Sequence, residues 1–407
     1  MSNSISKQNI REKSPEPKNV SRVTKLLEYN EIDDIILMKK KHHEYLIVKY
    51  DKKSTLPHQY YKVGYMRSIV VDTNTKEIVC IAPSKSIPLE ELQTECTKNN
   101  SPIHYEEFVD GVMINVFWDK GREKWQYATR SNIGADIRFY IQNSTSKTFR
   151  TMFEEALNEC NINLDVLPKV GNYTFVLQHP DNRIVTPVYK PRAVLVEGHL
   201  YGKAESDEDI IPLFPHGTKK EDIEFRKMID EHNIPIPEKY QISTIKEARD
   251  KYASRNTDFS CVGVILKDLN QGWRSKIRNP VYEEVKKLRS NIPKLQYLYL
   301  VLRQSGSVKK YLEYFREHAN EFKNYRNQIH DFTQNLYLNY VDCFIKKKAE
   351  INTYPHQYRV CMKALHKIYL DTMMLEGRHI HKGVVIKFFN NMPPQRQMYV
   401  LNYNYRK

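Results

Sequence analysis

The sequence predicts an α+β protein in which a strand-rich domain, residues 21–280, is followed by an all-helical domain, residues 281–407. In the first part, short runs rich in β-branched and aromatic residues alternate with polar turns, as in a sheet of short strands. In the second part, apolar residues recur at steps of three and four, which is the spacing of one helix face. We expect this stripe to be a core face; it comprises Phe322, Tyr325, Ile329, Phe332, Leu336, Tyr340 and Phe344.

The composition favours a soluble, cytoplasmic protein with a polyanionic partner. The formal net charge is +15, and the 28 tyrosines offer stacking surfaces beside the cations, a combination suited to nucleic acid. A Lys- and Tyr-rich composition without any partner would give the same totals. No apolar run is long enough to span a bilayer, and the N-terminus has no signal-peptide core. Residues 1–20 are polar and are expected to form a disordered tail.

No metal site is expected from the cysteines and histidines. The six cysteines form no C-x-x-C pair, and the fourteen histidines show no His-Glu-x-x-His pattern. Zinc-finger spacing and a disulfide framework are therefore excluded, and reduced thiols are expected. A Walker-type loop and a Gly-rich dinucleotide fingerprint are also missing.

The remaining elements follow in order along the chain. A short helix and strands at 35–38, 45–50, 64–72 and 78–86 are expected within residues 21–100. A helix opens at 147–157, strands follow at 173–178 and 193–197, and a charged helical segment covers 219–252. Strands at 261–268 and 273–282 complete the first domain.

Residues 105–135 predict a β-hairpin. Asp110-Gly111 leads into a β-rich run, a polar loop at 119–124 ends it, and a second run closes on Thr129-Arg130-Ser131. Two such runs around a short polar loop are typical of a hairpin. Trp118 and Trp125 would then be cross-strand partners.

Seven short motifs stand in a particular order: Arg67, Lys85, Asp110-Gly111, Thr129-Arg130-Ser131, Pro180-x-Asn182-Arg183-Ile184-Val185, Gly263-Val264 and Lys276-x-Arg278. In this order they resemble the covalent nucleotidyltransferases, namely RNA and DNA ligases and capping enzymes, and especially the phage-type ATP-dependent RNA ligases. With the helical segment, the chain is similar to RNA-ligase-like proteins of large eukaryotic DNA viruses. The resemblance implies an antiparallel-sheet, ATP-grasp-like ligase domain. It also implies nucleotide and phosphate binding by Arg67, Asp110, Gly111, Arg130, Arg183, Lys276 and Arg278.

Three positions depart from the family pattern. The family has a nucleophilic lysine two residues before the Asp-Gly, where this chain has Phe108. An acidic residue four before the Pro and a Glu before the Gly-x-Val are replaced by Val176 and Val262. A phenyl ring offers no lone pair to attack phosphorus, and valine cannot recruit the metal that would neutralise the transferring phosphate.

We therefore expect a degenerate RNA ligase that binds nucleic acid, RNA above all, through a basic groove, without catalysis and without a required cofactor. One alternative is an active ATP-dependent ligase, with ATP and Mg²⁺ as cofactors, in which Lys85 has become the nucleophile. The simpler role for Lys85 is a phosphate contact. A second alternative is a structural or interaction protein of a virus particle. Lys382-Gly383-Val384-Val385-Ile386-Lys387 resembles a ligase motif, but it lies beyond the helical stripe and is expected to be a chance match.

Overall fold

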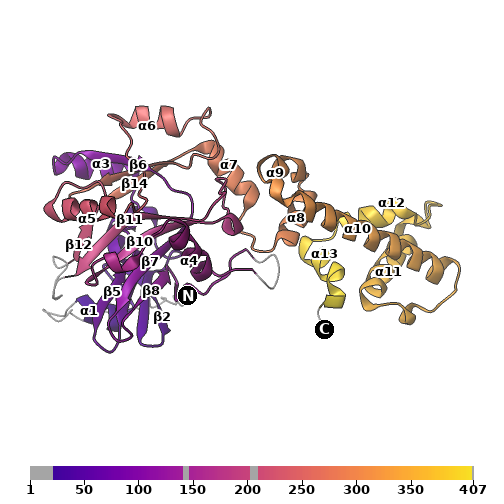
Figure 1. The fold of residues 1–407 in the computed structure, drawn as a ribbon. Coiled ribbons are helices and arrows are strands. Elements are labelled where there is room, and N and C mark those ends of the chain that lie inside the picture. Colours follow the sequence, from indigo (N-terminus) through magenta and orange to yellow (C-terminus); the bar gives the residue numbers. More distant parts are fainter. Residues whose placement is uncertain (1–21, 141–145, 202–209, 406–407) are drawn as a thin grey trace, which may run out of the picture.

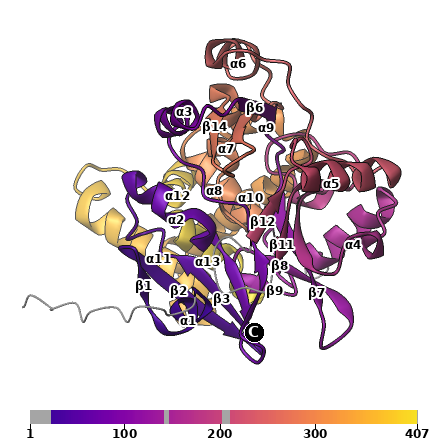
Figure 2. The same ribbon diagram turned by 90° about the vertical axis from the view of Figure 1, so that its left-hand side faces the viewer.

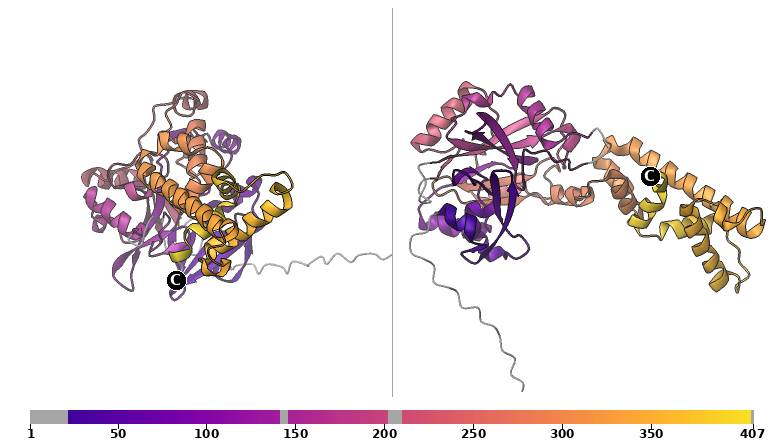
Figure 3. Two further views of the ribbon diagram at one scale, coloured as in Figure 1. Left: turned by 90° about the vertical axis from the view of Figure 1, so that its right-hand side faces the viewer. Right: turned by 90° about the horizontal axis from the view of Figure 1, so that it is seen from below.

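A computed structural model describes residues 22–140, 146–201 and 210–405, and it is an α+β structure as predicted (Figure 1). Strands fill the N-terminal body, and helices form an arm that extends from one side of it (Figure 3). The expected tail at 1–20 lies outside the described residues. Among those residues, no helix is both long and apolar enough to cross a membrane.

The first sheet is an antiparallel meander of five strands in sequence order, preceded by helix α1 (Arg22–Glu28). The buried side chains of its central strands, such as Val48 and Ile69, pack against α1. The expected strand at 64–72 is shorter than predicted, because Gly64–Arg67 form the 3₁₀ turn η2. The five strands are β1 (Glu31–Ile32), β2 (Ile35–His42), β3 (Tyr45–Tyr50), β4 (Ile69–Asp72) and β5 (Glu77–Ile81).

The second sheet has six strands, and seven of the eight residues of its central strand β10 (Gly171–Gln178) are buried. Helices α4 (Phe149–Glu159) and α5 (Lys220–Glu231) share one hydrophobic core with it and lie on the same side (Figure 2). The order is β12 (Ile210–Leu213), β11 (Arg192–Tyr201), β10, β7 (Val112–Asp119), β8 (Lys124–Thr129) and β9 (Asn132–Ile133).

The predicted hairpin is confirmed as β7 and β8, which pair antiparallel. Trp118 lies opposite Trp125, and their rings meet edge to face with centroids 5.4 Å apart. The aromatic pair stabilises the register, since edge-to-face contacts add to the buried area.

The third sheet has the order β14 (Arg274–Arg278), β13 (Gly263–Asp268) and β6 (Ile103–Glu107). Helices α3 (Leu89–Lys98) and α6 (Ile245–Tyr252) pack against it at the same end of the molecule (Figures 1 and 2). Gly263 has φ +131°, and a Cβ there would lie 2.1 Å from the carbonyl oxygen of Ile277. Only glycine therefore allows β14 to pair this closely with the start of β13.

The helical domain begins at α7, because the Asn279 side chain caps Pro280–Arg289 and ends the strand predicted over 273–282 at Arg278. Five members of the predicted stripe are buried along α10, and Tyr325 and Phe344 are partly buried, so the core-face prediction is confirmed. The segment 382–387 lies in helix α12, which confirms that it is no ligase strand. The other helices are α8 (Leu295–Gln304), α9 (Val308–Tyr314), α10 (Ala319–Tyr340), α11 (His356–Ile368), α12 (Lys382–Asn390) and α13 (Pro394–Leu401).

Candidate functional site

A pocket of about 770 Å³ lies where the three sheets meet. Arg67 ends η2 just before β4, Arg130 directly follows β8, and β14 carries Lys276. Seven residues singled out from the sequence line this pocket: Arg67, Lys85, Asp110, Gly111, Arg130, Lys276 and Arg278. The fold thus brings together side chains that are up to 211 residues apart in the chain, counted from Arg67 to Arg278.

Arg274 also lines the pocket, and the sequence analysis missed it. Successive side chains of a strand point to opposite faces, so Arg274, Lys276 and Arg278 share one face of β14. This alternation was visible in the sequence and would have identified Arg274.

Two of the pocket arginines donate hydrogen bonds to backbone oxygens. Arg67 Nη1 donates to the carbonyl oxygen of Pro83 at 2.9 Å, and Arg130 Nε donates to the carbonyl oxygen of Arg67 at 3.2 Å. The Arg130 guanidinium also lies 4.8 Å from the centroid of the Tyr50 ring. Burial, together with the positive charges of Arg274 and Arg130, lowers the pKa of Arg67 to about 9. Hydrogen bonds to backbone oxygens thus fix the orientation of Arg67 and Arg130, but neither guanidinium is paired with a carboxylate of the described residues.

Two lysines share the same unfavourable surroundings. Burial, followed by the charges of Arg278, Lys85 and other cations, lowers the pKa of Lys276 to about 7. Burial, followed by Arg67 and Arg274, lowers the pKa of Lys85 to about 8. The Lys85 ammonium lies 3.4 Å from the Tyr60 ring centroid and donates to the carbonyl oxygen of Ser86 at 3.0 Å.

The carboxylates around the pocket are engaged elsewhere. Glu106 forms a buried ion pair with Lys267 at 2.7 Å, and Arg278 is paired with Glu283. Within the described ranges, no carboxylate lies in ion-pair distance of the five other cations, Arg67, Lys85, Arg130, Arg274 and Lys276. Burial lowers the pKa of Arg274, and the charges of Glu197 and Glu106 act against this from beyond ion-pair distance. A group of cations without directly paired carboxylates can bind an anion.

The three positions that depart from the ligase pattern also line the pocket. Phe108 packs against the helical core, with its ring 5.7 Å from the Arg278 guanidinium. Val176 and Val262 are buried, and Val176 packs with Val109 and Val194. Apolar side chains therefore occupy the places where the family has a nucleophile and two acidic groups.

Asp110 does not face a ligand with a free carboxylate, contrary to what the resemblance implied. Its Oδ2 accepts hydrogen bonds from the backbone amides of Val185 at 3.1 Å and Thr186 at 3.0 Å. Its Oδ1 accepts from the hydroxyl of Tyr282 at 2.6 Å. Asp110 thus joins the turn before β7 to a distant loop and to α7. Neighbouring Gly111 is required for packing, because a Cβ there would lie 2.3 Å from the carbonyl oxygen of Leu177.

Arg183 lies outside the residues that line the pocket, so its predicted phosphate binding stays a prediction. Its Nη1 pairs with Glu317 at 2.7 Å, its Nη2 donates to the carbonyl oxygen of Tyr314 at 3.0 Å, and its Nε donates to that of Val185 at 2.9 Å. The guanidinium also lies 4.7 Å from the centroid of the Phe315 ring. Arg183 therefore connects the strand-rich body to the helical domain.

Replacing Asp110 tests its structural role. We expect Asp110→Ala to lower the free energy of unfolding by about 2–4 kcal/mol, because two backbone amides and one hydroxyl lose their buried acceptor. Tyr282→Phe, which removes one of the three bonds, should cost about 1 kcal/mol. Urea denaturation followed by circular dichroism measures both, and equal stability of Asp110→Ala and the unmodified chain would contradict the assignment.

No protein-family model matches this chain. A search of curated proteins finds an RNA ligase of Rhodothermus phage RM378, 21% identical over 212 residues. The chain spans about half the length of this relative, since the match covers 47% of each protein.

Two solved structures of Naegleria gruberi RNA ligase are also similar. The one with PPi has a TM-score of 0.36 and 13% identity and covers 51% of this chain and 58% of that one. A mutant with ATP and Mn has a TM-score of 0.35 and 12% identity, covering 50% and 58%. The predicted resemblance is confirmed by the sequence match with the phage enzyme. Over about half of its length, this chain is similar to an RNA ligase.

Proposed function

We propose that this chain binds RNA in the cationic pocket, and that it forms no covalent nucleotide bond at position 108. The observation that carries the proposal is the set of five cations without a carboxylate partner in one 770 Å³ pocket, described above. The phosphate groups of a nucleic acid supply the missing negative charge. Charge-assisted hydrogen bonds from arginine to phosphate are among the strongest in proteins.

RNA is favoured over a simple anion by the pocket's aromatic residues. Tyr60 and Phe108 line the pocket beside the cations. Bases of single-stranded nucleic acid stack on such rings while the backbone meets the positive charges. The curated relative is named an RNA ligase, and the net charge of +15 favours a polyanion.

Loss of catalysis follows from the three apolar replacements. Phe108 cannot form a phosphoramide, because it has no nitrogen. Val176 and Val262 cannot ligate a divalent cation, and the Asp110 carboxylate already accepts hydrogen bonds from three donors. A pocket of this composition has cations that can hold a phosphate group in place. It lacks the nucleophile and the metal ligands that phosphoryl transfer requires.

A second function is favoured by one specific observation, the lowered pKa values of Lys85 and Lys276. An amine that is partly unprotonated near pH 7–8 is a competent nucleophile. Its nitrogen would attack the α-phosphorus of ATP, forming an N–P bond as the bond to pyrophosphate breaks. Lys85 was the candidate from the sequence, and Lys276 becomes a second one.

Charge reversal tests the RNA-binding proposal. We expect Arg130→Glu, Arg274→Glu and Lys276→Glu each to weaken binding of a single-stranded RNA by about tenfold or more, since each lost charge-assisted contact is worth about 1.5–3 kcal/mol. The slope of log affinity against log salt should fall by about one per lost phosphate contact. Fluorescence anisotropy at several salt concentrations measures both quantities.

Lys227→Glu is the matched control, because it makes the same charge change on α5, where the side chain is 77% exposed and outside the pocket lining. Its affinity should stay within about twofold of the unmodified chain. If a variant that combines Arg130→Glu, Arg274→Glu and Lys276→Glu is folded and binds RNA as tightly as this control, the proposed pocket is the wrong site.

Label transfer tests the catalytic alternative. We expect no label to remain on the chain after incubation with α-phosphate-labelled ATP and Mg²⁺ or Mn²⁺ and denaturing electrophoresis, because position 108 lacks an amine. A retained label would support the relocated lysine. Loss of that label in Lys85→Ala or in Lys276→Ala would then identify which amine reacts.

A further inference from the structure

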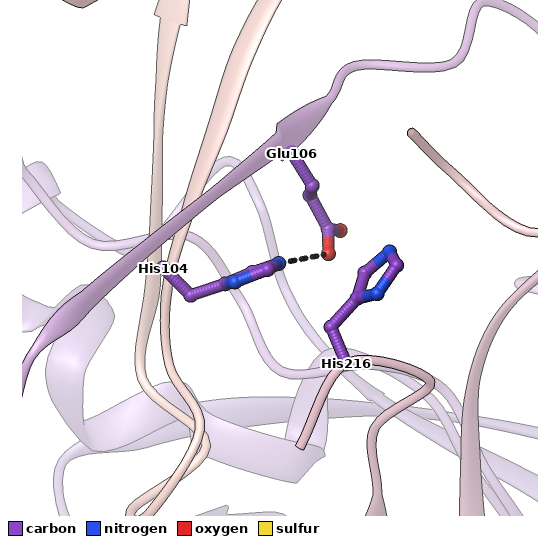
Figure 4. Close-up of side chains that lie close together, drawn as sticks. All are labelled: His104, Glu106 and His216. Atoms are coloured by element: carbon purple, nitrogen blue, oxygen red, sulfur yellow. Dashed lines mark ion pairs between the residues drawn. The ribbon is translucent and has the colours of Figure 1, made fainter. Parts of the chain in front are cut away.

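A second cluster of functional side chains adjoins the pocket. His104 and Glu106 lie two residues apart on β6, so their side chains share one face of the strand. His216 comes from the loop between β12 and α5. Figure 4 shows the ring of His104 directed at the carboxylate of Glu106, with the ring of His216 beside this pair. His104 is 8% exposed and Glu106 is 3% exposed.

The geometry of this cluster suits an ion. One potential ligand atom from each of the three residues lies within 4.8 Å of the other two. His104 Nε2 lies 3.3 Å from Glu106 Oε2, and the two imidazole centroids are 5.1 Å apart. His104 Nε2 is buried, and apart from this contact with Glu106 it has no polar partner within the described part of the chain. A buried nitrogen with so few partners can accept a metal bond in addition.

We propose that His104, Glu106 and His216 bind one Zn²⁺ ion. Two imidazole nitrogens and one carboxylate oxygen are donors that zinc accepts, whereas Mg²⁺ prefers oxygen ligands. Ligands about 2.1 Å from a tetrahedral ion lie about 3.4 Å apart, so the three side chains need to approach by roughly 1 Å. A water molecule would complete the four ligands.

The surrounding contacts prepare the three ligands. Lys267 binds Glu106 Oε1 at 2.7 Å and leaves Oε2 for the ion. The same ion pair favours the ionised carboxylate, which is the form that binds a metal ion.

His216 already has two contacts, and binding an ion exchanges one of them for a metal bond. Its Nε2 lies 2.8 Å from the carbonyl oxygen of Pro237, and its Nδ1 lies 3.5 Å from Arg226 Nη1. Arg226 is also paired with Asp230 at 2.8 Å and is 41% exposed, so it can move aside. A ligating histidine whose other nitrogen is bound to a backbone carbonyl is a recurring arrangement around zinc.

Glu106 is the one carboxylate among the three proposed ligands. Glu106 itself lines the cationic pocket, so a bound Zn²⁺ would stabilise the wall of that pocket.

Metal content of the untagged full-length chain tests the proposal. After equilibration with ZnCl₂ and gel filtration, mass spectrometry should find one Zn²⁺ per chain, with an upward shift in Tm. A tenfold excess of Mg²⁺ should not displace it. His104→Ala and His216→Ala should both lose the bound zinc, whereas His232→Ala, at an exposed position at the end of α5, should retain it.

A second measurement keeps the test independent of whether the variants fold. Co²⁺ added to the unmodified chain should give the visible absorption bands of a four-coordinate site at a ratio of one. If neither Zn²⁺ nor Co²⁺ binds stoichiometrically, or if folded variants keep their zinc, the proposal is wrong and Glu106 serves only the ion pair with Lys267. RNA binding is measured in a separate experiment, so a failure to bind zinc would not contradict the proposed RNA-binding pocket.

Discussion

Mutual repulsion among desolvated cations is the interaction on which the site depends. Arg67, Arg130, Arg274, Lys85 and Lys276 approach one another in a pocket where burial already disfavours charge. Folding must offset that cost with packing elsewhere, because no carboxylate among the described residues is paired with these five side chains. A polyanionic ligand would neutralise this repulsion. The free energy that the cations lose by repelling one another in the unbound protein would then contribute to the affinity for the ligand.

The rest of the fold holds this pocket open by contacts between distant segments. Asp110 connects three of them through two backbone amides and one hydroxyl. Arg183 joins the body to the helical domain through Glu317 and the backbone. Gly263 lets β13 and β14 come close, which sets the position of the strand that carries Lys276. Asp110 and Arg183 therefore shape the pocket through contacts within the protein.

The sequence was sufficient for the features that depend on local periodicity. The β7–β8 hairpin, the strands at 45–50 and 173–178, and the stripe along α10 all follow from alternation or helical spacing, and all are present. The positions of seven residues around one pocket followed from the order of the ligase-like motifs. The hydrogen-bonding roles of Asp110 and Arg183 could not be predicted from the sequence, because their partners lie 75 and 134 residues away along the chain. For the same reason His104 and His216 showed no motif: only the fold places them side by side.

In this account, the pocket cations repel one another until a bound anion neutralises their charge. Titration of Lys276 and Lys85 tests this claim most directly. The lysines can be reductively ¹³C-methylated and assigned by comparison with Lys276→Arg and Lys85→Arg, and their pKa values followed by NMR with and without a single-stranded RNA. The account predicts values of about 7 and about 8 in the free chain. RNA should raise both, because its phosphates favour the charged amines; affinity should therefore fall as pH rises above about 7. Values near the ordinary 10.4 in the free chain, unchanged when RNA is added, would contradict it.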